Sequence, residues 1–236
     1  MNKIERANTG LHSSVLGKVD RLQLLSQARI LDLGCGSGEM LRNLAARGYT
    51  SLFGLDISPP LGSSAIRYLE GDLDACATGF ENGSTDLVLA VEVLEHVENM
   101  GVLLKEIARI LKPGGWLLAT TPNVMSLESR LRFLLLGKLK QFDEIGDPTH
   151  VYPIFPHPFG KVLHRHGLEV AQQWSCPEDG SSPTSRPGLR AAAGLLAALG
   201  LRGMPRGDNL CLLIRKLAAD GVPAIATKKS ALTAHY

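Results

Sequence analysis

The chain has 236 residues and a mass of 25.3 kDa, which is enough for one sizeable hydrophobic core. Hydrophobic residues make up 44% and charged residues 20%, a balance typical of globular domains that excludes a disordered or fibrous chain. With 25 basic against 23 acidic residues, the formal net charge of +2 does not favour a protein held to nucleic acid or anionic lipid by its overall charge.

The cysteines and the apolar runs indicate where the protein works. Four cysteines are spread along the chain without a Cys-x-x-Cys pair, which excludes a zinc ribbon and argues against a disulfide framework. The first ten residues, MNKIERANTG, lack the apolar core of a secretory signal peptide. The most apolar uncharged run, residues 191–201, is 11 residues long, well short of the roughly 20 that span a bilayer. We therefore expect a cytoplasmic protein without a transmembrane segment.

The apolar pattern predicts strands that alternate with helices. An amphipathic helix is expected at 11–26, then strands at 28–33, 51–55, 66–69, 86–91 and 116–120, helices at 39–47 and 103–111, and two further strands at 168–174 and 209–215. Such alternation predicts right-handed β-α-β crossovers and one doubly wound α/β sheet.

The same pattern divides the chain into segments. We predict one domain at 28–217, an N-terminal helical segment at 1–27 and a flexible tail at 218–236. Residues 123–158 form a long insertion after the fifth strand, and such connections are usually functional or disordered. Its basic, leucine-rich part at 129–140 has three interpretations: a lid over an acceptor, a peripheral helix on a membrane surface, or a plain amphipathic helix packed on the core.

A glycine-rich turn lies between the first strand and the next helix, an arrangement that binds ligands with negative charge. Its glycines are Gly34, Gly36 and Gly38, but Glu39 stands where a dinucleotide-binding fingerprint needs its last glycine. Asp32 and Glu39 would repel a pyrophosphate, and no Lys-Ser/Thr pair follows the glycines as in a phosphate-binding loop. A ligand with both an ammonium and a carboxylate avoids this repulsion. The amino-acid end of S-adenosylmethionine is such a ligand.

Acidic residues also follow the second and third strands. Asp56 is placed to accept both ribose hydroxyls of an adenosyl group, and Ile57 beside it offers an apolar contact to adenine. Asp72 with Leu73 is placed to bind the adenine amino group. Because ligands of open α/β sheets bind at the carboxyl ends of the strands, these residues are expected to border one site.

In these positions the sequence resembles the class I S-adenosylmethionine-dependent methyltransferases that act on small molecules. The motifs DLGCGSG, GLDIS, EGDLD, EVLEH and LKPGG stand in the family's order, and the resemblance covers about residues 28–175. It implies a Rossmann-like, seven-stranded sheet, mostly parallel with an antiparallel last strand. We assign the cofactor to Asp32, Gly34, Gly36, Asp56, Ile57, Asp72 and Leu73, with Glu92 near its methionyl end.

The acceptor side is expected just after the fourth strand. Glu92, Glu95 and His96 would share one face if this turn is helical. His96 is the candidate catalytic base, with His150 from the insertion beside it. The same four residues are alternatively ligands of a divalent metal ion. This pattern resembles the sites of small-RNA 2′-O-methyltransferases and of ubiquinone-pathway O-methyltransferases, which implies a metal that activates a vicinal diol or catechol.

The sequence therefore predicts a methyltransferase that acts on a small molecule or glycan, with oxygen the expected target. Residues 121–142 also look like members encoded among cell-surface polysaccharide genes, which favours a sugar or lipid-linked glycan acceptor. A nicotinamide-dependent oxidoreductase and a non-catalytic module that binds S-adenosylmethionine remain alternatives. The missing third fingerprint glycine argues against the oxidoreductase. We expect no nucleic-acid partner, because a net charge of +2 gives little support to a basic face.

Overall fold

A computed structural model describes residues 10–60, 65–75, 78–144, 146–177 and 207–218, with Gly188, Ala191 and Leu195 as single residues. Its elements in chain order are α1 (Leu11–Arg21), β1 (Arg29–Leu33), α2 (Glu39–Ala46), β2 (Ser51–Asp56), β3 (Ile66–Glu70), β4 (Thr85–Val91), the 3₁₀ turn η1 (Leu94–His96), α3 (Met100–Ile110), β5 (Leu111–Pro122), α4 (Leu127–Leu136), α5 (Pro156–Arg165), β6 (Leu168–Cys176) and β7 (Asn209–Lys216). The predicted tail lies outside the described residues from position 219 onward.

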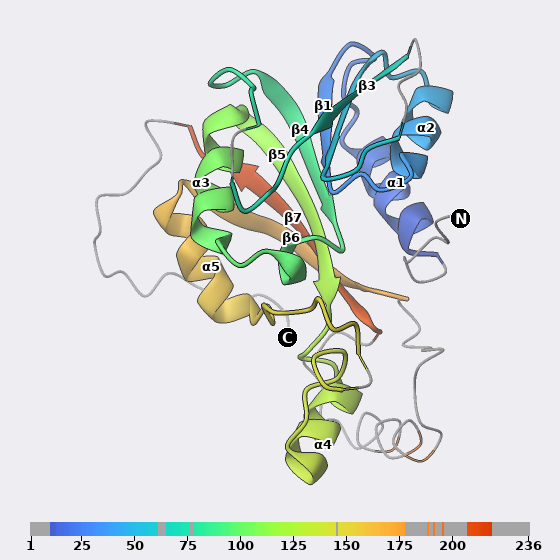
Figure 1. The fold of residues 1–236 in the computed structure, drawn as a ribbon, viewed down its shortest axis with the longest axis vertical. Coiled ribbons are helices and arrows are strands. Elements are labelled where there is room, and N and C mark those ends of the chain that lie inside the picture. Colours follow the sequence, from blue (N-terminus) through green and yellow to red (C-terminus); the bar gives the residue numbers. More distant parts are fainter. Residues whose placement is uncertain are drawn as a thin grey trace.

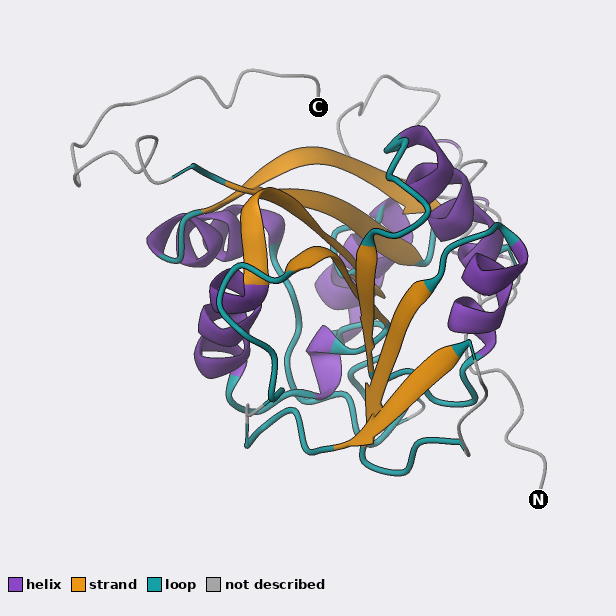
Figure 2. Ribbon diagram, turned by 90° about the horizontal axis from the view of Figure 1, so that it is seen from above, coloured by secondary structure: helices purple, strands orange, loops and turns teal. Residues whose placement is uncertain are grey.

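One seven-stranded sheet in the order β3-β2-β1-β4-β5-β7-β6 forms the centre of the fold (Figure 1). The neighbouring strands from β3 to β5 pair in parallel, whereas β7 runs antiparallel to both β5 and β6. This confirms the predicted doubly wound α/β class with its antiparallel last strand. Parallel strands need crossover connections, and the helices that make them cover the sheet (Figure 2).

Both faces of the sheet are buried, each against its own helices. One apolar cluster contains α3 and α5 side chains such as Leu104 and Leu163, and the other contains side chains of α1 and α2, such as Val19 and Leu41. Successive strand residues feed the two clusters in turn, as Ile30 and Leu31 do. Burial on both faces explains why the central strands are almost continuously apolar in sequence.

The fifth strand is longer than the predicted 116–120, because it includes the Pro-Gly-Gly segment at 113–115, which was expected to separate the strand from the preceding helix. Thr85 pairs with Leu111, and regular pairing resumes from Leu87 and Trp116 after an irregularity. Gly114 adopts a φ of +78°, which favours glycine. The segment therefore acts as a bulge within the ladder rather than as a turn before it.

The leucine-rich stretch of the insertion forms α4, but its leucines do not pack on the core. Ser126 caps the helix by accepting a hydrogen bond from Ser129 N at 3.2 Å, and Ser129 is the helix's buried residue. The helix projects beyond the carboxyl end of β5 (Figure 1). This excludes the plain core helix among the three interpretations. Within the described residues, no helix has the length and apolar character needed to cross a membrane.

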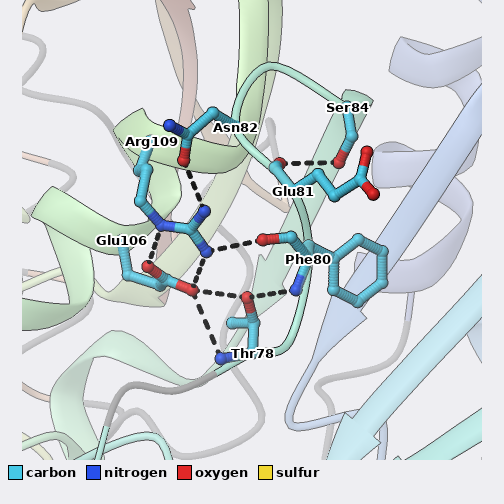
Figure 3. A network of polar contacts seen from close by, with 7 residues as sticks. All are labelled: Thr78, Phe80, Glu81, Asn82, Ser84, Glu106 and Arg109. Carbon is cyan, nitrogen blue, oxygen red and sulfur yellow. Dashed lines mark hydrogen bonds and ion pairs between the residues drawn. The ribbon is translucent and has the colours of Figure 1, made fainter.

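A polar network ties α3 to the loop that precedes β4 (Figure 3). Glu106 accepts hydrogen bonds from Thr78 N, Thr78 Oγ1 and the Arg109 guanidinium, which also donates to Asn82 Oδ1 and Phe80 O. The bonds from Arg109, ahead of those from Thr78, lower the pKa of Glu106 to about 2. The network therefore anchors the far end of the loop that begins after β3.

We predict that this network makes stability depend on pH in the acid range. The folded-state pKa of Glu106 lies below its ordinary value of 4.5, so its contribution is present above 4.5 and is lost as the pH falls toward about 2. Glu106→Gln is expected to lower the free energy of unfolding by roughly 2 kcal/mol at neutral pH and by much less near pH 2. Urea titrations across this range measure the difference. The exposed Glu98→Gln serves as control, and a pH-independent difference would contradict the assignment.

Candidate cofactor and acceptor site

A cavity of about 530 Å³ opens at the carboxyl ends of β1 to β4. All eight residues that the sequence assigned to the cofactor line it: Asp32, Gly34, Gly36, Asp56, Ile57, Asp72, Leu73 and Glu92. His96 and Thr149 also line it, so the predicted acceptor region and the predicted cofactor region share one cavity.

The glycine turn at the end of β1 requires glycines for steric reasons. Gly34, Gly36 and Gly38 have φ values of +62°, +52° and +77°. A Cβ atom at Gly34 would lie 2.7 Å from Val93 Cγ2, and one at Gly38 would overlap the Tyr68 hydroxyl. The turn therefore keeps its backbone open toward the cavity and begins α2 there, where free N–H groups favour a carboxylate.

Asp56, at the end of β2, connects this turn to the neighbouring strand. Its Oδ2 accepts a hydrogen bond from Gly36 N at 2.8 Å, and its Oδ1 accepts one from Ser58 N at 2.9 Å. Each carboxylate oxygen can accept a further bond, so the side chain still has acceptor capacity for two hydroxyls. Ile57 is 71% exposed beside it and presents an apolar surface.

The loop after β3 is held by side chains that accept from the backbone. Asp72 Oδ1 accepts from Asp74 N at 2.9 Å, and Asp74 Oδ1 accepts from Asn99 N at 2.7 Å, at the start of α3. Leu73 packs against the core from the same loop. These bonds fix the part of the loop that faces the cavity.

Asp32 is a buried carboxyl group at the floor of the cavity, with 3% of its surface exposed. Burial, with a smaller contribution from the nearby Asp56 carboxylate, raises the pKa of Asp32 to about 8. Ionising such a group is favourable when a cation lies against it. The position therefore fits the ammonium of an amino-acid ligand.

Glu92 leaves β4 in a strained conformation, with a φ of +53° that is uncommon outside glycine. Its backbone N–H donates to Thr120 Oγ1 at 3.0 Å, and Thr120 Oγ1 donates to Glu92 Oε1 at 2.9 Å. Burial raises the pKa of Glu92 to about 7, while Thr120 and the Asn209 side chain lower it. These contacts hold the carboxyl group at the cavity wall.

The expectation that Glu92, Glu95 and His96 share one helical face is wrong. Glu92 has a left-handed backbone and lies before the 3₁₀ turn. The turn itself contains Glu95 and His96 but not Glu92, so the three side chains do not share a helical face. The structure instead groups Glu95, His96 and His150, with one potential ligand atom of each within 4.8 Å of the others. Glu92 is not part of this group, so three of the four predicted metal ligands come together.

A hydrogen-bonded chain orients His96. Its Nδ1 lies 3.1 Å from Thr149 O and 2.9 Å from Thr149 Oγ1, which itself donates to Asp147 Oδ1 at 2.5 Å. Because a carbonyl oxygen only accepts, Nδ1 carries the proton, and the basic lone pair of the ring is therefore on Nε2. The bonds from Thr149 lower the pKa of Asp147, so this carboxylate stays ionised at the end of the chain.

His150 is held in the same manner. Its Nδ1 donates to Gln141 O at 2.8 Å, and Gln141 adopts a φ of +69°. The rings of His96 and His150 lie edge to face with centroids 4.7 Å apart. Both imidazoles therefore have Nδ1 bound to a backbone carbonyl, which selects the tautomer with its lone pair on Nε2, the atom that acts as a base or a metal ligand.

Glu95 is fully buried between these groups. Burial, followed by the Glu92 carboxylate, raises its pKa well above the ordinary value. Its backbone carbonyl accepts hydrogen bonds from Val151 N and Tyr152 N, both at 2.9 Å. The insertion is thereby tied to the turn after β4.

A buried ion pair anchors the other end of the insertion. Lys140 Nζ lies 2.8 Å from Asp208 Oδ1 and 3.3 Å from Glu128 Oε2. Asp208 precedes Asn209, whose side chain forms a hydrogen bond with Glu92. The residue after Lys140 is Gln141, so this pair also holds the carbonyl that binds His150.

Four residues of the site were not predicted: Asp147, Thr149, His12 and Asn209. The Asp147 side chain accepts from Thr149 N at 2.9 Å, an Asx turn that the Asp-Pro-Thr sequence would have indicated. His12 lines the cavity from the start of α1. Asn209 reaches Glu92 from the start of β7. The sequence around His12 and Asn209 does not indicate these positions, because the residues that each contacts in the site are distant in sequence.

Comparisons with known proteins agree with this geometry. Residues 9–173 match a family model described as a methyltransferase domain. A ubiquinone biosynthesis O-methyltransferase from Burkholderia cenocepacia is 34% identical over 169 residues, which cover 66% of this chain and 72% of that protein.

Solved structures show the same fold. An S-adenosylmethionine-dependent methyltransferase from Archaeoglobus fulgidus has a TM-score of 0.55 at 19% identity, covering 87% of this chain and 94% of its own. A phosphoethanolamine N-methyltransferase 2 from Haemonchus contortus, in complex with S-adenosylhomocysteine, has a TM-score of 0.58 at 18% identity, covering 87% and 52%. Since the family model matches well over half of the chain, the protein belongs to the S-adenosylmethionine-dependent methyltransferases.

Proposed function

We propose that the protein methylates a hydroxyl oxygen of a small molecule or glycan. The observation that carries this proposal is the position of His96, which lines the cofactor cavity in the tautomer whose Nδ1 donates its proton and whose basic lone pair is on Nε2. Similarity to an O-methyltransferase supports oxygen as the target. The family match gives no support to the nicotinamide-dependent alternative.

The cavity residues fit S-adenosylmethionine, which supplies an electrophilic methyl carbon. Asp32 would face its ammonium, and the N–H groups of the first turn of α2 would face its carboxylate. Asp56 would accept the ribose hydroxyls, and Ile57 would cover one face of the adenine. Asp72 and Leu73 would contact the adenine edge. The fit rests on the buried carboxyl of Asp32 and the exposed apolar surface of Ile57.

On the acceptor side, the chain's own groups move one proton. His96 Nε2 takes the proton that the acceptor hydroxyl loses as its oxygen is methylated. Thr149 and Asp147 hold the imidazole and stabilise the positive charge that it gains. The Nδ1–H of His96 donates to Thr149 Oγ1, which in turn donates to the Asp147 carboxylate. Positioning the two reactants in one cavity supplies the rest of the rate enhancement.

The first test is transfer of a labelled methyl group to a metabolite extract and to panels of catechols and sugars. The wild type is expected to label a hydroxyl-bearing acceptor, and Asp56→Ala to weaken S-adenosylhomocysteine binding at least about tenfold, because the ribose then loses its carboxylate acceptor. Calorimetry measures the binding. Asp20→Asn, an exposed carboxylate in α1, is the control. Tight binding without transfer to any acceptor would indicate a non-catalytic module, and labelling of nitrogen alone would contradict the oxygen target.

A second prediction follows from the raised pKa of Asp32. Below pH 8 the free protein holds this carboxyl group protonated, and an ammonium placed against it favours the ionised form. Binding of S-adenosylhomocysteine should therefore release a proton, and affinity should rise with pH until about 8. Calorimetry in buffers of different ionisation enthalpy counts the proton. Asp32→Asn should bind more weakly and abolish the release; unchanged release in this variant would refute the assignment.

We infer a second property from the grouping of Glu95, His96 and His150, a divalent-cation site. Two imidazoles and one carboxylate are a common ligand set, and the carbonyl bonds to both Nδ1 atoms are those that orient metal ligands. A bound cation would act as a Lewis acid toward the acceptor hydroxyl. His96 would then be a ligand rather than the base, so the two roles are alternatives.

Binding of Mn²⁺, followed by electron paramagnetic resonance, distinguishes them. We expect the wild type to bind the ion and His150→Ala to bind it at least about tenfold more weakly, because one of three ligands is lost. The exposed His164→Ala is the control and should bind as the wild type does. Absence of Mn²⁺ binding, together with activity that survives a chelator, would leave His96 as the base.

A further inference from the structure

The end of α4 carries four consecutive large apolar side chains that the fold leaves uncovered. Phe133, Leu134, Leu135 and Leu136 are 55%, 79%, 65% and 52% exposed. We call these four residues the α4 tip. Exposed apolar residues are ordinary when they are scattered, but a contiguous group of this kind marks an interaction surface.

The distribution of these side chains around the helix indicates what covers them. Consecutive residues of an α-helix point about 100° apart, so four in a row face every side of the axis. A protein groove binds one apolar stripe of a helix, at spacings of three and four residues, and would leave the remaining sides in water. A fluid apolar medium can surround the tip completely. The geometry therefore favours a lipid bilayer over a second protein chain.

The charges at the border of the α4 tip are consistent with this occupant. Arg130 is exposed one turn before the tip, and Lys138 is exposed directly after Gly137 ends the helix. Lys138 pairs with the exposed Glu144 at 2.7 Å, a contact that contributes little in water and can exchange for a lipid phosphate. Cations beside an apolar insertion are typical of helices that bind membrane surfaces. The low net charge of the chain means that the apolar side chains must provide most of the binding.

The tip also has a fixed relation to the cavity. The α4 helix follows the carboxyl end of β5, where Thr120 binds Glu92 of the cavity wall. Lys140, buried against Asp208, holds the return of the chain after α4. The tip lies at the far end of this anchored projection (Figure 1).

We propose that the α4 tip inserts into the interfacial region of a lipid bilayer and holds the protein peripherally on the membrane surface. This inference goes beyond the proposed methyl transfer and does not depend on the identity of the acceptor. It requires only that exposed apolar area be transferred from water to the boundary between headgroups and acyl chains.

Co-sedimentation with phosphatidylcholine vesicles, with and without added phosphatidylglycerol, tests the proposal on the full chain. The wild type is expected to bind both, and more tightly to the anionic vesicles. The double substitution Leu134→Ser with Leu135→Ser should lower the partition coefficient at least about tenfold, because it removes the two most exposed side chains of the tip. The matched control is the double substitution Leu25→Ser with Val102→Ser, at residues that are 68% and 52% exposed elsewhere on the fold. This variant should bind vesicles as the wild type does.

Phe133→Trp provides a second measurement, since its emission should shift to the blue when vesicles are added. Wild-type protein that binds neither vesicle overturns the proposal, as does equal binding by the serine variant. A dimer that dissociates in the serine variant, without vesicle binding, would instead assign the tip to a second copy of the chain. Melting temperature and S-adenosylhomocysteine affinity should stay unchanged in both double variants. Because vesicle binding needs neither cofactor nor acceptor, its outcome is independent of the proposed function.

Discussion

The hydrogen bond between Gly36 N and Asp56 Oδ2 joins the two strand ends on which the cavity is built. Parallel strands bring their carboxyl ends to one edge of the sheet, but they do not by themselves determine the path of the turns that follow. The left-handed glycines let the turn after β1 pass close to β2, and the Asp56 carboxylate holds it there. Asp32 is buried in the same place, and its raised pKa reflects burial and the neighbouring Asp56 carboxylate. The site thus places two carboxyl groups and the N–H groups of the first turn of α2 within one small space, which suits a zwitterion better than a phosphate.

The acceptor side depends on contacts of a different kind. Its histidines come from a turn after β4 and from an insertion more than fifty residues later, and backbone carbonyls orient both rings. The insertion is held at two points, by the Glu95 carbonyl and by the buried Lys140–Asp208 pair. Removing one partner of a buried ion pair is costly, so the pair fixes the position of the segment. The chemistry of the site therefore rests on long-range contacts, which other members of this fold can vary without changing the sheet.

The α4 projection shows how the same insertion can serve a second purpose. Its base is polar and anchored to the cavity wall, whereas its end is apolar on every side. A helix whose leucines faced the core would close the domain, but these leucines face outward. The insertion therefore separates a part that builds the site from an exposed apolar part, for which we propose insertion into a lipid bilayer.

The sequence by itself determined the order of the seven strands, the helices α1 to α3, the glycine turn and the acidic residues at the ends of β1, β2 and β3, because these features depend on local periodicity and on residues next to strand ends. It did not predict α5. It also indicated His96 and His150, since imidazoles near a strand end and in a long insertion suggest acid–base chemistry. Only the tertiary structure decided that Glu92 stays with the cofactor cavity while Glu95 joins the histidines, because a single left-handed residue breaks the helical face that spacing implied. It likewise decided the tautomers through Thr149 and Gln141, the contact of Asn209 with Glu92, and the outward direction of the α4 leucines. Each of these results from packing between segments far apart in the chain, on which local sequence carries no information.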